Sequence, residues 1–318
     1  MLLNIILLLT GFALLIKGAD FLVLGSSSLA RRFNISELVI GLTIVALGTS
    51  APEMVVSVIA AMKGQNDVAI GNVIGSNIFN LFLILGVAAM ITPIVVQHST
   101  IVKEIPYTII AAFMLMLLAN DHLYTDSRAN RIGFIDGLIL LALFAIFLYY
   151  VFRNMKNDNQ EMSSDKKTFG LWKSLLLILT GLAGLVLGGS LSVNNAVDIA
   201  HTLGISERII GLTIVAAGTS LPELATSAVA AYRKNADIAV GNIVGSNIFN
   251  ILLVLATSAL LQPLPYQLTF NTDITFLIGG TMLLLLFTYT GKKAVIQRWQ
   301  GTALVLLFIG YTITLIVS

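Results

Sequence analysis

The sequence predicts an all-α integral membrane protein with ten transmembrane helices in two inverted five-helix repeats, in which broken helices 2, 3, 7 and 8 form the core. Three observations predict this class. Of the 318 residues, 57% are hydrophobic and only 11% are charged, whereas soluble domains carry roughly 25% charged residues. Ten apolar runs are long enough to cross a bilayer. The chain also repeats itself after 170 residues.

The ten expected spans follow one another with mostly short loops. A membrane-spanning helix needs about 17–25 apolar residues. The runs lie at 2–28, 37–62, 68–92, 104–120, 133–152, 171–199, 207–232, 238–261, 273–290 and 300–317. The longest polar segment, 154–170, is rich in Asn, Asp and Lys and cannot form a core. We therefore expect a first repeat at 1–153, a linker at 154–170 and a second repeat at 171–318.

The repeat is clearest in two stretches. Residues 41–46 are identical to 211–216, and 71–80 differ from 241–250 only by exchanged Val and Ile. A unit with an odd number of spans must insert its second copy upside down. Inverted repeats of this kind are typical of secondary transporters.

Loop charges predict the orientation in the membrane. Loops after odd-numbered spans hold 13 of the 18 basic residues: Arg31, Arg32, Lys103, Arg153, Lys156, Lys166, Lys167, Lys173, Arg233, Lys234, Lys292, Lys293 and Arg298. Because basic loops remain in the cytoplasm, we expect the 154–170 loop to be cytoplasmic and both termini to be extracellular. The membrane is then the plasma (inner) membrane.

The second span contains an interruption with a charge. Pro52 removes a backbone donor, and Glu53 places a carboxylate at mid-span, which is costly unless it lines a polar cavity. Thr49 and Ser50 add hydroxyls, and Thr219, Ser220, Pro222 and Glu223 repeat the pattern. Prolines alone could simply kink a helix, but two matching glutamates indicate a function. Freed carbonyls, hydroxyls and carboxylates form the all-oxygen shell that Ca²⁺ and Na⁺ prefer.

The second repeated stretch supplies further oxygens. Ser76 and Asn80 lie four residues apart and share a helix face, as do Ser246 and Asn250. We expect these four side chains to face the ions. The remaining amides could equally join helices to one another; they are Asn72, Asn77, Asn242 and Asn247.

Both stretches, in this order and number, resemble the alpha repeats of the sodium/calcium exchanger family, prokaryotic type, in the cation/calcium antiporter superfamily. The resemblance implies alternating-access exchange of Ca²⁺ for Na⁺ through four adjacent cation sites in a four-helix core. It implies that spans 2–28 and 171–199 slide past this core as the gate. It implies that Glu53 and Glu223 coordinate Ca²⁺. It also implies that further ligands come from Ala46, Thr49, Ser50, Ser76, Ala216, Thr219, Ser220 and Ser246.

One position departs from the family pattern. Structurally described members carry an aspartate at the position of Asn250, whereas both copies here end in asparagine, Asn80 and Asn250. Two carboxylates balance one Ca²⁺ or two Na⁺, and a third Na⁺ would leave an unfavourable net charge at low dielectric. A buried glutamate could instead carry a proton. The sequence therefore leaves Ca²⁺/H⁺ or other cation/proton antiport open beside Ca²⁺/Na⁺ antiport.

Other classes of function fit less well. The chain has no cysteine, and its three histidines are scattered. An intramembrane enzyme would need a catalytic pair or a zinc motif at mid-span, so we expect no enzyme and no cofactor. A cation channel usually builds its pore by oligomeric symmetry. A net charge of +2 gives no reason to expect nucleic acid. The expected partners are the transported ions and the lipid bilayer, with no obligate protein partner evident, and we expect Lys17 to pair with Asp20.

Overall fold

The computed structural model describes residues 1–121, 130–153, 168–204, 216–290 and 294–317. Within these ranges seven helices are long and apolar enough to cross a membrane, and the bent pair Glu37–Thr49 and Ala51–Met62 makes an eighth. The all-α membrane class is therefore confirmed. The start of the seventh predicted span falls in 205–215, outside the described residues, while α16 (Arg298–Val317) occupies the tenth predicted run.

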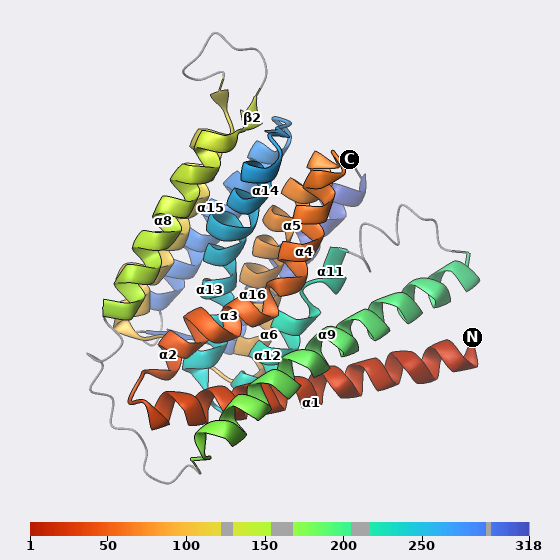
Figure 1. Cartoon of the computed structure of the whole chain (residues 1–318), viewed down its shortest axis with the longest axis vertical. Coiled ribbons are helices and arrows are strands. Elements are labelled where there is room, and N and C mark those ends of the chain that lie inside the picture. Colours follow the sequence, from red (N-terminus) through yellow and green to blue (C-terminus); the bar gives the residue numbers. More distant parts are fainter. Residues whose placement is uncertain (122–129, 154–167, 205–215, 291–293, 318) are drawn as a thin grey trace.

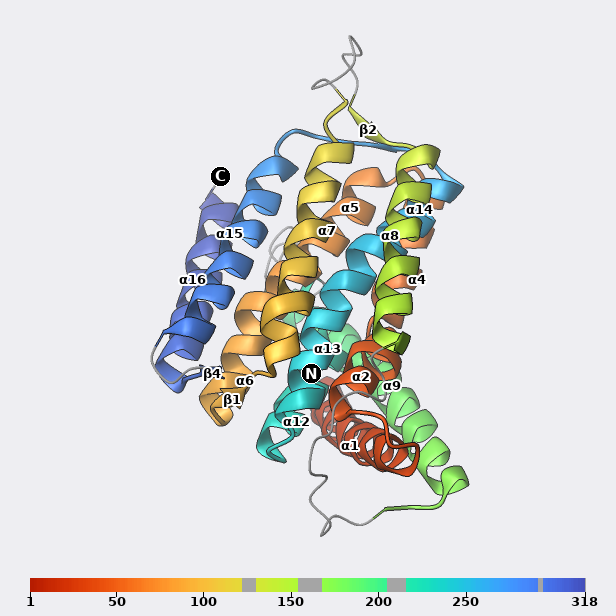
Figure 2. The ribbon, with the colours of Figure 1, turned by 90° about the vertical axis from the view of Figure 1, so that its left-hand side faces the viewer.

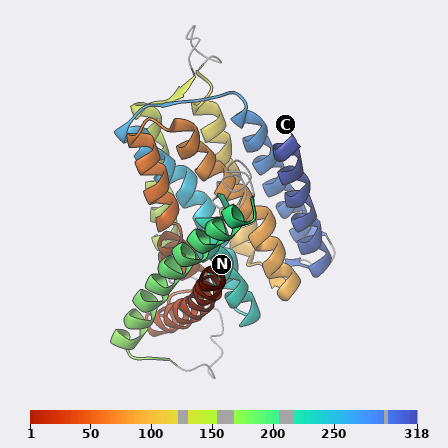
Figure 3. The ribbon, with the colours of Figure 1, turned by 90° about the vertical axis from the view of Figure 1, so that its right-hand side faces the viewer.

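Two long helices, α1 (Leu2–Arg32) and α9 (Leu171–Thr202), lie side by side and run across the direction of the remaining helices (Figures 1 and 3). Glycines line their contact. A Cβ atom added at Gly18 would lie 2.8 Å from the carbonyl oxygen of Gly181, and one at Gly11 would lie 2.9 Å from that of Gly188. Only glycine permits this approach of two backbones, so the pair meets along a glycine seam in which backbone packs directly on backbone.

The second predicted span bends where the sequence predicts an interruption. It consists of α2 (Glu37–Ile40), the π-helical segment η1 (Gly41–Val45), α3 (Ala46–Thr49) and α4 (Ala51–Met62), and the bend is 47°. Pro52 lies in the first turn of α4, where its missing N–H removes no helical hydrogen bond. Glu53 consequently sits in the first turn of the new helix.

The matching part of the second half has the same local form. The helix α11 (Ala216–Gly218) ends in a turn at Thr219 and Ser220, and α12 (Leu221–Tyr232) begins directly after it. Pro222 and Glu223 again occupy the first turn of the new helix.

The third and eighth spans run without a break. They comprise α5 (Asn66–Ile78), η2 (Phe79–Ile84) and α6 (Leu85–Ile91) in the first half, and α13 (Ala236–Phe249), η6 (Asn250–Leu255) and α14 (Ala256–Leu261) in the second. The predicted breaks in helices 3 and 8 are therefore wrong. Neither segment contains a proline, and each irregularity is a wider π-helical turn within a continuous helix, a feature that is frequent at functional sites.

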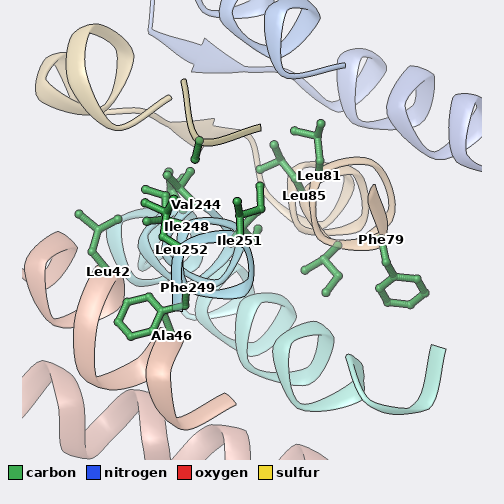
Figure 4. Packing of buried hydrophobic residues seen from close by; sticks show 14 of the residues in the cluster. Leu42, Ala46, Phe79, Leu81, Leu85, Val244, Ile248, Phe249, Ile251 and Leu252 are labelled. Atoms are coloured by element: carbon green, nitrogen blue, oxygen red, sulfur yellow. The ribbon is translucent and has the colours of Figure 1, made fainter. Parts of the chain in front are cut away.

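The helix α13 forms the centre of the packed core. A Cβ atom on Gly241 would lie 2.9 Å from the Cα atom of Gly41, and one on Gly245 would lie 2.7 Å from the Cβ atom of Ala46. Figure 4 shows Ala46 on the bent span beside Phe249 of α13. This close crossing brings the break at Ser50 next to the second repeated stretch.

Outer helices and two short ribbons complete the fold (Figure 2). The outer helices are α7 (Ile105–Leu118), preceded by η3 (Thr100–Glu104), α8 (Phe134–Arg153), α15 (Phe270–Tyr289) and α16. The ribbons are antiparallel pairs of two-residue strands, β1 (Ile94–Val95) with β4 (Val295–Ile296) and β2 (Arg131–Ile132) with β3 (Leu264–Pro265). They link loops that are distant in sequence, and the sequence analysis did not predict them.

Asp20 does not pair with Lys17 as predicted. Arg233, directly after α12, donates from Nε to Asp20 Oδ1 at 2.6 Å, while Lys17 is exposed. Close by, Asn235 donates from Nδ2 to Ser27 Oγ at 2.8 Å. The prediction fails because α1 packs on the end of α12, where Arg233 offers Asp20 a partly exposed cation. These two contacts fasten α1 to the second half.

Candidate cation-binding site

The two helix breaks face each other and exchange hydrogen bonds. Ser50 donates from Oγ to Glu223 Oε1 at 3.1 Å, and Ser220 donates from Oγ to Glu53 Oε1 at 2.9 Å. Both glutamates have an exposed fraction of 0%. Each break therefore supplies a hydroxyl to the carboxylate of the other, and the structure brings these four predicted residues together.

Two asparagines hold the breaks in place. Asn242 accepts at Oδ1 from Thr49 Oγ1 at 2.9 Å, and its Nδ2 donates to Ser227 Oγ at 3.0 Å and to the carbonyl oxygen of Glu223 at 3.4 Å. Both ends of its amide are thus engaged with protein atoms. Of the two roles left open by the sequence, this geometry favours positioning over direct ion contact.

Asn72 repeats this arrangement in the first half. It accepts from Thr219 Oγ1 at 3.3 Å and donates to Ser57 Oγ at 2.9 Å and to the carbonyl oxygen of Glu53 at 3.2 Å. The partners Ser57 and Ser227 were not among the residues predicted from the sequence. Their signal was available, because both are serines at positions that match under the 170-residue shift.

The other predicted side chains form a more uneven group. Asn77 donates from Nδ2 to the carbonyl oxygen of Asn247 at 3.1 Å, and Asn80 donates from Nδ2 to Asn247 Oδ1 at 3.1 Å. These bonds tie the third span to the eighth. Asn250 is different: it is fully buried, and neither its Oδ1 nor its Nδ2 has a hydrogen-bond partner.

Several buried oxygens of the predicted residues have no hydrogen-bond partner. They are Glu53 Oε2, Glu223 Oε2, Ser76 Oγ, Ser246 Oγ, Asn80 Oδ1 and Asn250 Oδ1. Leaving a buried polar atom unpaired costs about 1–3 kcal/mol, and more for a charged one. Neither salt bridge in the described ranges involves Glu53 or Glu223. The arrangement therefore presents negative and neutral oxygens to a cation.

The two alanine carbonyls stay predictions as ligands. The carbonyl oxygen of Ala46 accepts from Thr49 Oγ1 at 3.3 Å and from the Ser50 backbone N–H at 3.0 Å, so an ion would have to compete with both donors. Ala216 begins α11 at the matching place, directly after residues outside the described ranges.

Few of the oxygen atoms that the candidate site offers to a cation belong to charged side chains. Nowhere in the described ranges do three or more His, Asp or Glu side chains gather as a metal-holding group. The site instead combines two carboxylates with hydroxyl and amide oxygens, which are ligands of hard cations.

Comparisons with known proteins place the chain in a family. The family described as sodium/calcium exchanger protein matches residues 3–153 and 173–317. The putative antiporter CaxA of Alkalimonas amylolytica is 40% identical over 98% of both chains, and the sodium/calcium exchanger MaX1 of Methanosarcina acetivorans is 30% identical over 98% of both. A structure of the sodium-calcium exchanger NCX_Mj, soaked with Na⁺ and Ca²⁺, aligns with a TM-score of 0.83 at 37% identity over 97% of each chain.

These matches extend over both halves and nearly the full length. Together with the paired motifs and the packed helix breaks, they confirm the predicted resemblance. The chain belongs to the sodium/calcium exchanger family of multi-pass membrane antiporters.

Proposed function

We propose that this protein is a secondary active antiporter that exchanges Ca²⁺ for Na⁺ across the plasma membrane by alternating access. The observation that carries the proposal is the set of buried, unpartnered oxygens on the predicted residues, which includes one oxygen from each of Glu53 and Glu223. Two buried carboxylates without a cationic partner are unfavourable. Bound Ca²⁺, or two Na⁺, balances their charge and supplies the missing contacts.

We further infer ten spans in two inverted five-helix repeats, at 1–153 and 171–318, joined by a cytoplasmic linker at 154–170. Support comes from the reciprocal bonds: Ser50 to Glu223 and Ser220 to Glu53 exchange places under the 170-residue shift. The loop charges support extracellular termini. A tag fused to the N-terminus should be accessible from outside intact cells, and accessibility from the cytoplasm alone would overturn the orientation.

The charge of the site controls when the gate, formed by α1 and α9, can move. Moving two uncompensated carboxylates past an apolar barrier is costly, so the conformational change proceeds only when ions neutralise Glu53 and Glu223. The glycine seam between α1 and α9 lets this pair move as one body past the core. This coupling makes transport an exchange, because each direction of the change requires cargo.

The neutral side chain of Asn250 favours a second candidate, Ca²⁺/H⁺ exchange on the same scaffold. With two carboxylates, two protons can replace one Ca²⁺ without leaving a net charge, as can two Na⁺. A passive cation channel is the candidate from another class, and it would need no counter-gradient.

Uptake of radioactive Ca²⁺ into proteoliposomes distinguishes these candidates. Ca²⁺/Na⁺ exchange predicts uptake when Na⁺ is loaded inside and diluted outside, with the pH equal on both sides. Uptake that follows a pH gradient but not a Na⁺ gradient would identify Ca²⁺/H⁺ exchange. Uptake without either gradient would contradict antiport. The Glu53→Gln variant, reconstituted in parallel, reports leakage that does not pass through the site.

A further inference from the structure

An apolar groove of about 380 Å³ lies between the end of α1, the bent span and α8, and none of its lining residues is a predicted ion ligand. Its volume falls within the range of roughly 300–1,000 Å³ that is usual for small-molecule sites. Four buried side chains line it from α1, α2, α8 and α13; they are Leu29, Ile40, Phe144 and Phe249. Thr43, its one polar lining residue, donates its hydroxyl to the Val39 carbonyl oxygen at 2.6 Å. Among the described residues, the lining therefore offers a ligand no free polar group.

The groove is open towards the surroundings of the protein. Phe33, Ile44, Leu47 and Phe152 also line it, and their exposed fractions are between 36% and 54%. In a membrane protein, an open apolar surface of this kind meets acyl chains, and polar ligands gain nothing from it. The lining thus selects a hydrocarbon chain as the occupant.

Two arginines near the groove indicate what headgroup the hydrocarbon chain carries. Arg32 directly precedes Phe33 at the end of α1, and Arg153 directly follows Phe152 at the end of α8. Both are exposed, and neither takes part in the salt bridges seen within the described ranges, whereas Arg31 bonds Glu37 at 2.8 Å. The ends of α1 and α8 lie at the same end of the molecule, next to α2 (Figures 1 and 2). Basic residues at helix ends attract anionic headgroups.

We propose that the groove binds one anionic phospholipid, with an acyl chain along the apolar lining and the headgroup phosphate at Arg32 and Arg153. One wall belongs to α1 and the bent span, and the other belongs to α8 and α13. The lipid therefore bridges the gate helix and the surrounding scaffold. This proposal concerns a site separate from the ions and does not depend on which cations are exchanged.

Quenching of tryptophan fluorescence by brominated lipids tests the proposal. The background carries Trp172→Phe and Trp299→Phe, which removes both native tryptophans. Phe152→Trp then reports on the groove, and Phe113→Trp, on α7 and 55% exposed, is the matched control outside it. Quenching by brominated phosphatidylglycerol is compared with quenching by brominated phosphatidylcholine in the same vesicles.

We expect a preference for phosphatidylglycerol of about five- to 25-fold at the groove reporter, at about fivefold for each arginine, and a ratio near one at the control. Arg32→Gln with Arg153→Gln should remove the preference, whereas Lys63→Gln, an exposed cation at the end of α4, should leave it unchanged. Equal ratios at both reporters, or a preference that survives loss of both arginines, would overturn the proposal.

A second measurement avoids substitutions altogether. After exchange into phosphatidylcholine, native mass spectrometry of the unaltered protein should detect one added phosphatidylglycerol per chain at limiting lipid. Binding of phosphatidylcholine and phosphatidylglycerol in equal amounts would contradict the anionic headgroup.

Discussion

The two halves of the candidate cation site agree closely around the glutamates and differ around the asparagines. At the breaks, the bonds between the two halves are reciprocal: Ser50 to Glu223 at 3.1 Å matches Ser220 to Glu53 at 2.9 Å. One span further along, Asn80 donates to Asn247, whereas the matching Asn250 has no partner at either polar atom. We call the group formed by Ser50, Glu53, Ser220 and Glu223 the carboxylate layer. The second group, which consists of Asn77, Asn80, Asn247 and Asn250, is the amide layer.

We infer from this difference that the glutamates balance the charge of bound ions, whereas the asparagines influence which ions bind. The carboxylate layer consists of identical residues in both halves, so we expect the two glutamates to contribute equally to balancing the charge of bound cations. In the amide layer, Asn80 is partly occupied in joining two helices, and Asn250 is free to meet an ion. Substitutions in the first layer should therefore have matching effects in the two halves, and substitutions in the second should not.

The largest effect is expected from neutralising either glutamate. Glu53→Gln and Glu223→Gln should each reduce Ca²⁺ transport by more than about 100-fold, because one carboxylate cannot balance a divalent ion in a buried site. Glu104→Gln is the matched control: Glu104 is also a buried glutamate with one oxygen bound by a hydroxyl, that of Tyr150, but it lies in η3 and not at either helix break. Proteoliposome uptake measures all three.

Near-normal transport in either site variant would refute the assignment. A strong loss in one and a weak loss in the other would instead break the equivalence of the carboxylate layer. Retention on size-exclusion chromatography at the normal volume excludes misfolding as the cause.

The residues of the carboxylate layer could be predicted from the sequence. Many of the contacts that hold the surrounding helices in place could not. A proline followed by a glutamate inside an apolar run indicates both the bend and the charge, and the predicted span 37–62 coincides with the helices from Glu37 to Met62. The pairing of Arg233 with Asp20 joins residues 213 positions apart. Helical periodicity describes neighbours along one helix and carries no information about such contacts.

The predicted breaks in the third and eighth spans failed for a related reason. Glycine and asparagine lower helix propensity, which made an interruption plausible at 71–80 and 241–250. Burial against neighbouring helices outweighs that preference, and the chain absorbs the irregularity as π-helical turns at Phe79–Ile84 and Asn250–Leu255. Propensity alone cannot distinguish a wider turn from a break.

The positioning asparagines should give the next largest effect, again equal in both halves. Asn72→Ala and Asn242→Ala each release a threonine hydroxyl, a serine hydroxyl and the carbonyl oxygen of a glutamate. If the site loses about as much binding free energy as one unpaired buried group costs, about 1–3 kcal/mol, Ca²⁺ affinity should fall about 10- to 100-fold. Isothermal titration calorimetry on the purified protein measures this fall.

Rescue separates positioning from a general loss of packing. Asn72→Asp and Asn242→Asp keep the acceptor oxygen for Thr219 and Thr49 but lose the Nδ2 donor, so they should retain part of the affinity that alanine removes. Affinities of the aspartate variants no better than those of the alanine variants would show that the threonine contact contributes nothing.

The amide layer should respond unequally to added charge. Asn250→Asp places a third carboxylate at a position without partners, so it should bind a further monovalent cation and shift the reversal potential of exchange. Asn80→Asp replaces the Nδ2 donor to Asn247 Oδ1 with an acceptor. It should lower the melting temperature and leave the stoichiometry unchanged, because two acceptors then face each other.

Reversal potentials and thermal unfolding with and without Ca²⁺ test both variants. Ligand that binds only the folded state raises the apparent stability, so Asn250→Asp should show greater stabilisation by cations than the unaltered protein. Equal shifts in the two variants would mean that Asn80 and Asn250 contact ions equivalently, and the proposed division of the amide layer would be wrong.

The smallest effect is expected at the contact between α1 and the second half. Asp20→Asn removes the ion pair with Arg233, which is partly exposed, so its contribution is about 0.2–1 kcal/mol. The counterpart of Asp20 under the repeat is Ser190 on α9, which cannot form such a pair. The pair therefore ties α1 directly to the second half, and the repeat gives α9 no equivalent ion pair. Because the chain has no native cysteine, the labelling rate of Ser27→Cys reports how often α1 leaves α12. Asp20→Asn should raise this rate up to about fivefold, and Lys17→Gln on the same helix should not. An unchanged rate in Asp20→Asn would show that the glycine seam and apolar packing alone hold α1 in place. The ion pair would then make no difference between α1 and α9.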